Sequence, residues 1–99
     1  MYQGTTPTHK FKLNIDTSII KKFRVLYAQN DDVLLTKTEE DVKYEDGFAV
    51  VRLSQEDTFL FSKYSPITIQ LRVLTKNGDA LVSVPTKRSI VECLSDEVL

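Results

Sequence analysis

Apolar and polar side chains alternate over several stretches of the chain, which is the pattern of a β-strand with one buried face. In residues 8–15, lysines alternate with Phe11 and Leu13, so one face is apolar and the other is polar. Residues 67–75 alternate in the same way and predict the clearest strand. Residues 23–29 carry apolar side chains on both faces, which predicts a central strand.

Turn-forming residues separate these stretches at short intervals. The sequences Asn30-Asp31-Asp32, Glu45-Asp46-Gly47 and Asn77-Gly78 are typical of tight turns between strands. Further strands are predicted at residues 33–38, 42–44, 48–53 and 80–84, with pairing resumed through 89–93. Pro85 lacks a backbone donor, so we expect it at an edge, a bulge or a change of strand.

One segment favours a helix. Ser54 followed by Asp57 matches a capping box, in which two side chains bond backbone N–H groups at the start of a helix. We therefore expect one short helical turn within residues 54–61. In the alternative interpretation, the preceding strand continues through Phe59-Leu60-Phe61.

The pattern predicts an all-β fold, an antiparallel β-sandwich of about seven strands and of immunoglobulin-like size. A small Greek-key barrel is the alternative. A chain of 99 residues forms one domain, which we place at residues 8–94. Residues 1–7 are predicted to be an extended N-terminal arm, and residues 95–99 a frayed C-terminus.

Charge and hydropathy narrow the classes of partner. With 13 basic and 14 acidic residues, the net charge is −1, so no surface for nucleic acid or an anionic membrane is indicated. No apolar stretch has the length of a membrane span, and the first residues lack an apolar targeting segment. We therefore expect protein partners, and a location in the cytoplasm of the cell that makes the protein.

No catalytic, cofactor or metal site is predicted. Motifs for nucleophilic catalysis, zinc hydrolysis and phosphate binding are absent, so no small-molecule substrate is expected. His9, the one histidine, precedes the first strand and is interpreted as exposed. Cys93, the one cysteine, lies among apolar residues and is interpreted as a small buried hydrophobe.

Acidic residues gather in three predicted loops, at 31–32, 39–41 and 45–46. Loops at one end of a sandwich can converge, so a Ca²⁺ site is one interpretation. The spacing of a calcium-binding loop is absent, however, and solvated loop carboxylates are the simpler interpretation.

Two exposed segments are candidates for contacts with a protein partner. The first is the arm, through Thr5, Thr6, Pro7 and Thr8. A polar extended arm either frays or docks along the sheet edge of a neighbouring subunit. The second is the turn with Asn30, Asp31 and Asp32. Edge strands of an open sandwich give two chains the same opportunity to pair.

Several short motifs are distributed along the chain: Gly4-Thr5-Thr6-Pro7-Thr8-His9, Tyr27-Ala28-Gln29, Lys37-Thr38, Leu53-Ser54-Gln55-Glu56-Asp57-Thr58, and Gln70-Leu71-Arg72-Val73-Leu74-Thr75 with Asn77-Gly78. Through these motifs the sequence resembles, over nearly its whole length, a group of short proteins encoded among the tail and baseplate genes of prophages in Gram-positive bacteria. The resemblance implies an immunoglobulin-like or baseplate-protein-like β domain in a virion or its assembly.

We therefore expect a non-enzymatic structural or accessory protein that contacts itself or other virion components and that ends in the virion. The alternative is an immunoglobulin-like module that recognises carbohydrate or a host surface through its loops. Tyr44 and Tyr64 are the loop aromatics that such a module would use.

Overall fold

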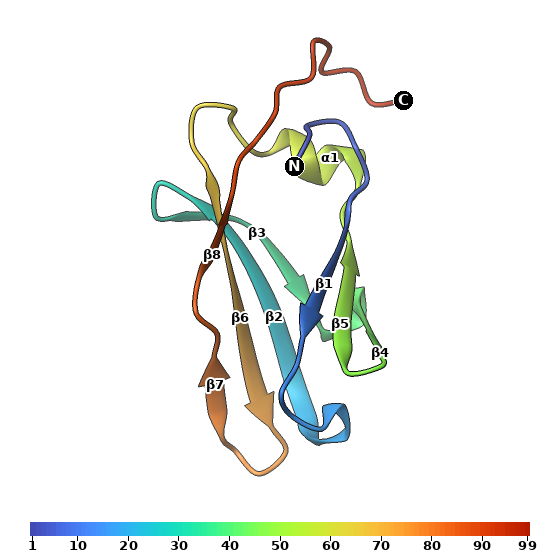
Figure 1. Cartoon of the computed structure of the whole chain (residues 1–99), viewed down its shortest axis with the longest axis vertical. Coiled ribbons are helices and arrows are strands. Elements are labelled where there is room, and N and C mark those ends of the chain that lie inside the picture. The colour runs from blue at the N-terminus through green and yellow to red at the C-terminus, as the bar shows by residue number, and fades with distance from the viewer.

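The computed structural model describes all residues 1–99 and consists of two antiparallel sheets packed face to face (Figure 1). The strands are β1 (Thr8–Lys12), β2 (Ile20–Gln29), β3 (Asp32–Thr38), β4 (Val42–Glu45), β5 (Phe48–Arg52), β6 (Ile67–Thr75), β7 (Ala80–Val82) and β8 (Thr86–Arg88). The helical elements are α1 (Gln55–Phe59) and two 3-10 turns, η1 (Thr17–Ile19) and η2 (Glu39–Asp41).

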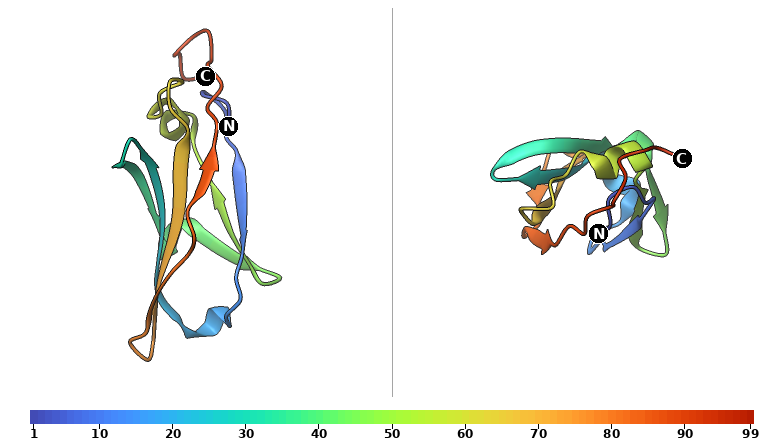
Figure 2. Two further views of the ribbon diagram at one scale, coloured as in Figure 1. Left: turned by 60° about the vertical axis from the view of Figure 1, so that its left-hand side comes forward. Right: turned by 90° about the horizontal axis from the view of Figure 1, so that it is seen from above.

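The two sheets differ in size. The smaller sheet has the order β1-β5-β4, and the larger has the order β3-β2-β6-β7, with β8 also paired to β6. Figure 2 shows the sheets as two layers, with β1 and β7–β8 on the same open side. The predicted all-β sandwich is confirmed, with eight strands in place of about seven, and β2 is central as its two apolar faces indicated.

The tight turns follow from residues that tolerate a positive φ. Asn30 and Asp31 have φ values of 51° and 67°, and they join β2 to β3. Asp46 and Gly47 have φ values of 50° and 81°, and they join β4 to β5. Gly78, at φ 90°, closes the turn between β6 and β7. All three predicted hairpins are therefore present.

Helix α1 begins at the predicted capping box. The Asp57 N–H donates to Ser54 Oγ at 3.0 Å, and the Ser54 N–H donates to Asp57 Oδ2 at 2.9 Å. These two bonds satisfy backbone donors that have no partner within the helix. The prediction of a short helix in this segment is confirmed, and the alternative of a continuing strand is wrong.

Several predicted strand bounds were wrong. Strand β1 ends at Lys12 instead of Ile15, and pairing after Pro85 resumes earlier than predicted, in β8. Within the predicted segment Ser89–Cys93, pairing is limited to Val91, which forms a bridge with Tyr2. The cause of the second difference is Ser83, whose Oγ accepts from the Leu71 N–H at 2.9 Å and interrupts the β6–β7 ladder. The chain therefore re-enters the same edge of β6 directly after Pro85.

The core lies between the two sheets and is small. Of the 99 residues, 15 are buried. The two sheets therefore bury the side chains at the centre of the sandwich and leave those near its open side partly exposed. Its largest fully buried side chains are Tyr27, Phe23, Phe61, Leu53 and Ile67. The radius of gyration is 14.2 Å, against about 13 Å for a compact domain of this length. The molecule is therefore elongated along its strands, at 46 × 27 × 17 Å.

Candidate functional site

The open side of the sandwich forms a groove between β1 and the β7–β8 segment, which we call the side groove. Three adjoining hollows of about 180, 270 and 190 Å³ make up this groove. Each is lined by residues of β1 or the chain just after it, and by residues of β6 and the β7–β8 segment. The groove arises because the larger sheet extends past the smaller one, so β7 and β8 face no strand across the core.

Strand β1 presents an unpaired backbone edge to this groove. The Leu13 N–H donates to the Gly47 carbonyl at 2.9 Å, and the Leu53 N–H donates to the Pro7 carbonyl at 3.0 Å. Hydrogen-bonded positions alternate along an antiparallel pair, so the odd-numbered residues of β1 bond β5. The backbone groups of the three even-numbered residues therefore point away from β5, and β1 has no second neighbour. These residues are Thr8, Lys10 and Lys12.

Apolar side chains form the floor of the side groove. Leu81 lies opposite the buried Val73 in the β6–β7 ladder, so it faces the core side of the sheet. It is nevertheless 44% exposed, because no residue of the smaller sheet covers it. Phe11, Leu13 and Leu71 pack against the core from the same groove and are only partly buried. The groove therefore has inward-facing apolar surface without a covering strand.

The side groove is positively charged. Lys10, Lys12 and Arg88 are among its lining residues, and no lining residue is an Asp or Glu. The Arg88 guanidinium donates to the Lys87 carbonyl at 3.2 Å and has no ion-pair partner. Because the whole chain carries 14 acidic residues, their absence from this surface favours an acidic ligand over a basic one.

His9 lies at one end of this groove, and the prediction that it is exposed was wrong. It is half-buried on β1, and its Nδ1 lies 2.8 Å from the Oη of the fully buried Tyr27. Burial, and then the nearby positive charge of Arg88, lower the pKa of His9 below its ordinary value of 6.5. Burial also raises the pKa of Tyr27. The pair is therefore neutral at pH 7, and sequence reasoning missed it because the partners are 18 residues apart.

The candidate contact residues of the arm lie against their own chain. The Gly4 N–H donates to Thr58 Oγ1 at 2.8 Å, and Tyr2 forms a parallel bridge with Val91. Thr6 Oγ1 accepts from the Arg52 guanidinium at 3.2 Å. Thr5 and Thr6 are exposed and Pro7 is partly buried, and none of the three lines the side groove. Of the four candidates, Thr8 alone lines it, at the end near His9.

The turn with Asn30, Asp31 and Asp32 is exposed but lies elsewhere. In Figures 1 and 2 it projects from the far end of β2, away from both the arm and β1. Asn30 Oδ1 accepts from the Ser65 hydroxyl at 3.2 Å, which ties the turn to the loop before β6. The structure therefore does not bring the two candidate contact segments into one surface.

Cys93 is exposed, so its predicted burial was wrong. The chain around Cys93 has left the sheets and passes over the arm and α1. There the Cys93 N–H donates to Gln3 Oε1 at 3.2 Å. A run of apolar residues is buried only where other residues pack over it. No sheet or helix packs over the residues around Cys93 in this way. Gly4 sits beneath these residues at φ 74°, and a side chain there would meet Phe59 at 2.8 Å.

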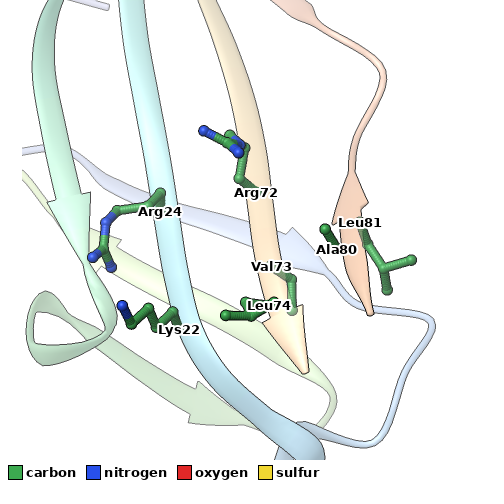
Figure 3. Close-up of a pocket in the computed structure, with 7 residues that line it drawn as sticks. All are labelled: Lys22, Arg24, Arg72, Val73, Leu74, Ala80 and Leu81. Atoms are coloured by element: carbon green, nitrogen blue, oxygen red, sulfur yellow. The ribbon is translucent and has the colours of Figure 1, made fainter. Parts of the chain in front are cut away.

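A separate hollow, of about 240 Å³, lies on the outer face of the larger sheet (Figure 3). Its basic side chains are Lys22, Arg24 and Arg72, and Arg24 lies directly opposite Arg72 across the β2–β6 pair. Arg24 forms an ion pair with Glu39, which compensates one of these charges. Figure 3 shows the two guanidinium groups spread apart instead of converging on one point.

The acidic loops do not assemble a metal site. No three His, Cys, Asp or Glu side chains converge anywhere in the chain. Among the acidic residues, Glu39 pairs with Arg24 and Asp41 caps η2. A different carboxylate, Asp57, forms an ion pair of 2.9 Å with Lys37 where both side chains are largely buried. Burial opposes its ionisation, but the Ser54 N–H and Lys37 together hold the pKa of Asp57 below its ordinary value.

Tyr44 and Tyr64 do not share a surface. The Tyr44 ring contacts Phe23, near the beginning of β2, with ring centroids 6.0 Å apart. Tyr64 is in the loop next to Ser65, whose carbonyl accepts from Gln29 at the other end of β2. Six residues of strand span about 20 Å, so the two rings form no common platform for a sugar.

Comparison with protein-family models, with curated protein sequences and with solved structures found no significant match to this chain. None of its helices combines the length and the apolar character needed to cross a membrane. The fold and the side groove are therefore the features of this chain that bear on its function.

Proposed function

We propose that this chain is a non-enzymatic structural or accessory protein of a phage or prophage tail or baseplate, and that it acts through protein–protein contacts. In this proposal the contact is made by strand addition: an extended segment of another chain pairs with the free edge of β1 and fills the side groove. Main-chain hydrogen bonds supply affinity in such complexes, and side-chain pockets supply specificity.

The order of the strands supports this proposal. The orders β1-β5-β4 and β3-β2-β6-β7 correspond to strands B-E-D and C′-C-F-G of an immunoglobulin sandwich. Along the chain, β1 to β7 also follow the order of the immunoglobulin strands B, C, C′, D, E, F and G. Strand A, which pairs with strand B in the complete sandwich, has no counterpart here. Its place corresponds to the free edge of β1, where the side groove lies.

The observation that carries the proposal is the combination of an unpaired edge with an uncovered apolar floor. Natural sandwiches protect their edges with charges, bulges or a covering segment. Lys10 and Lys12 are the protection that β1 carries, and they prevent unspecific pairing. The inward-facing Leu81 has no such protection and is exposed in the isolated chain.

The test is to delete the gene from the DNA that encodes it, induce particle formation and image the particles by electron microscopy. We expect tails or baseplates that are defective or lack a component, and restoration by the wild-type gene. A second complementation uses Lys10→Pro, which removes a free-edge N–H and leaves every β1–β5 hydrogen bond in place. Lys10→Ala is the matched control, because it removes the charge and keeps the N–H.

We expect Lys10→Ala to restore the particles and Lys10→Pro to fail. Infectious and structurally unchanged particles after deletion would refute the structural role. Restoration by Lys10→Pro would show that the contact lies outside the free edge of β1.

A further inference from the structure

We propose that the side groove binds residues 94–99 of a second copy of this chain, an inference that rests on the proposed function. The chain would then assemble with itself by inserting this C-terminal segment of one copy beside β1 of the next. The groove offers a free strand edge and an apolar floor, and the segment offers exposed apolar side chains and free backbone groups.

Residues 94–99 carry large apolar side chains in solvent. Leu94 is fully exposed, Leu99 is 94% exposed and Val98 is 45% exposed. The segment has no regular secondary structure, and its backbone hydrogen bonds go to side chains, including two with Gln55 at 2.8 and 3.1 Å. Its backbone groups are therefore available for a sheet ladder, at the cost of a few exposed bonds.

The charges of the two surfaces are complementary. The segment contains Asp96 and Glu97, whereas the groove is lined by Lys10, Lys12 and Arg88. Opposite charges on neighbouring strands stabilise their pairing and fix its register.

The alternation of a strand fits this arrangement. In an extended segment, Leu94, Asp96 and Val98 share one face, and Glu97 lies on the other. With the first face turned inward, Leu94 and Val98 meet the apolar floor, which runs from Leu81 to Phe11. Asp96 lies between them on the inward side, which Arg88 also faces because it pairs with the buried Ile67. Glu97 lies outward beside the lysines of β1.

The segment cannot enter the groove of its own chain without breaking contacts. Immediately before it, the Gln3 N–H donates to the Val91 carbonyl at 2.9 Å, and the Val91 N–H donates to the Met1 carbonyl at 2.8 Å. Beyond this point the chain continues past α1 and away from the groove, as Figures 1 and 2 show. Insertion of the segment into the groove of a second copy leaves these hydrogen bonds intact. We therefore infer that the segment in each groove comes from another molecule.

Sedimentation velocity on the full-length protein over a range of concentrations tests this inference with two classes of variant. The donor variant, Leu94→Ser with Val98→Ser, has an intact groove. The acceptor variant, Lys10→Pro, has an intact segment, and Leu81→Glu is a second acceptor variant in case proline impairs folding. Far-UV circular dichroism establishes that each variant is folded, and Lys10→Ala is the matched control for proline.

We expect the wild type to self-associate as concentration rises and each variant alone to remain monomeric. The loss of each apolar side chain of the donor weakens association at least about tenfold. An equimolar mixture of donor and acceptor variants should form a 1:1 complex, because one intact segment then meets one intact groove. Lys10→Ala should self-associate with reduced affinity.

Three results would overturn the inference: a wild type that stays monomeric, self-association that neither class of variant weakens, or a mixture that forms no complex. These results differ from failure of the proposed function. A monomeric wild type, together with particles that Lys10→Pro does not restore, means that the groove binds another virion protein. Particles unaffected by the gene deletion refute the proposed function itself.

Discussion

Gln29 holds the loop between α1 and β6, and its replacement by leucine is the most direct test of how this fold is stabilised. Its side chain is 5% exposed and makes three hydrogen bonds to that loop. Nε2 donates to the carbonyls of Ser62 and Ser65, both at 2.7 Å, and Oε1 accepts from the Ser62 N–H at 2.8 Å. One buried amide thereby fixes the entry of the chain into the central strand β6.

The expected cost of Gln29→Leu follows from these bonds. Each contributes a net ~1 kcal/mol, which gives about 3 kcal/mol for the three. Burial of the leucine side chain offsets about 1 kcal/mol of this loss. We therefore expect the free energy of unfolding to fall by about 2 kcal/mol, and the midpoint temperature to fall by about 8–16 °C for a domain of this size.

Urea unfolding followed by circular dichroism measures this change, with an unchanged dependence on urea as the sign that two-state unfolding persists. Gln70→Leu is the matched control. Gln70 lies on the outer face of the larger sheet and makes one such bond, from Nε2 to the Ser83 carbonyl at 3.1 Å. Its replacement should cost ~1 kcal/mol or less. Equal losses in the two variants would refute the reasoning, because the loop would then hold its position without Gln29.

Three further results are expected. Thr58→Val removes the hydroxyl that accepts from the Gly4 N–H, so unfolding free energy should fall by about 1–2 kcal/mol and the Gly4 amide should exchange faster with solvent. Thr58→Ser should retain both properties, and an unchanged exchange rate in the valine variant would contradict the anchoring role. The pKa of His9 is lowered in the folded state, so the unfolded chain binds the proton first as pH falls, and stability should decrease from about pH 7 to about pH 5. Urea unfolding at a series of pH values measures this decrease. His9→Asn should abolish the decrease in stability, since the chain has no other histidine. A decrease that persists in His9→Asn would mean that another group titrates. Cys93 should react with a thiol reagent about as fast in the folded as in the denatured protein, and slow labelling would contradict its exposure.

The elements that were predicted correctly depend on neighbouring residues. The capping box of α1 needs only Ser54 and Asp57, and the turn at Asp46-Gly47 needs only residues that accept a positive φ. The alternating strand at 67–75 became β6 with the same bounds. Such features are decided by local backbone preferences and by side-chain periodicity, which are properties of short segments.

The candidate site was predicted less well. Thr8 borders the side groove, but Thr5, Thr6, Pro7 and the turn at Asn30 do not. The sequence showed that Leu71 and Leu81 are apolar residues of predicted strands, so an inward position for both could be expected. Whether another strand covers an inward position depends on the pairing of distant segments, and no local pattern records it.

The sequence by itself determined that this chain forms short antiparallel strands around one core, because alternation and turn chemistry act over a few residues. The tertiary structure alone decided which edges remain free. A three-stranded sheet facing a larger one leaves one edge of β1 unpaired and leaves Leu81 uncovered. The fold also places His9 against Tyr27, and it places Cys93 in solvent. Burial and pairing are properties of the whole assembly of strands, since each side chain is covered only by what the fold places opposite it.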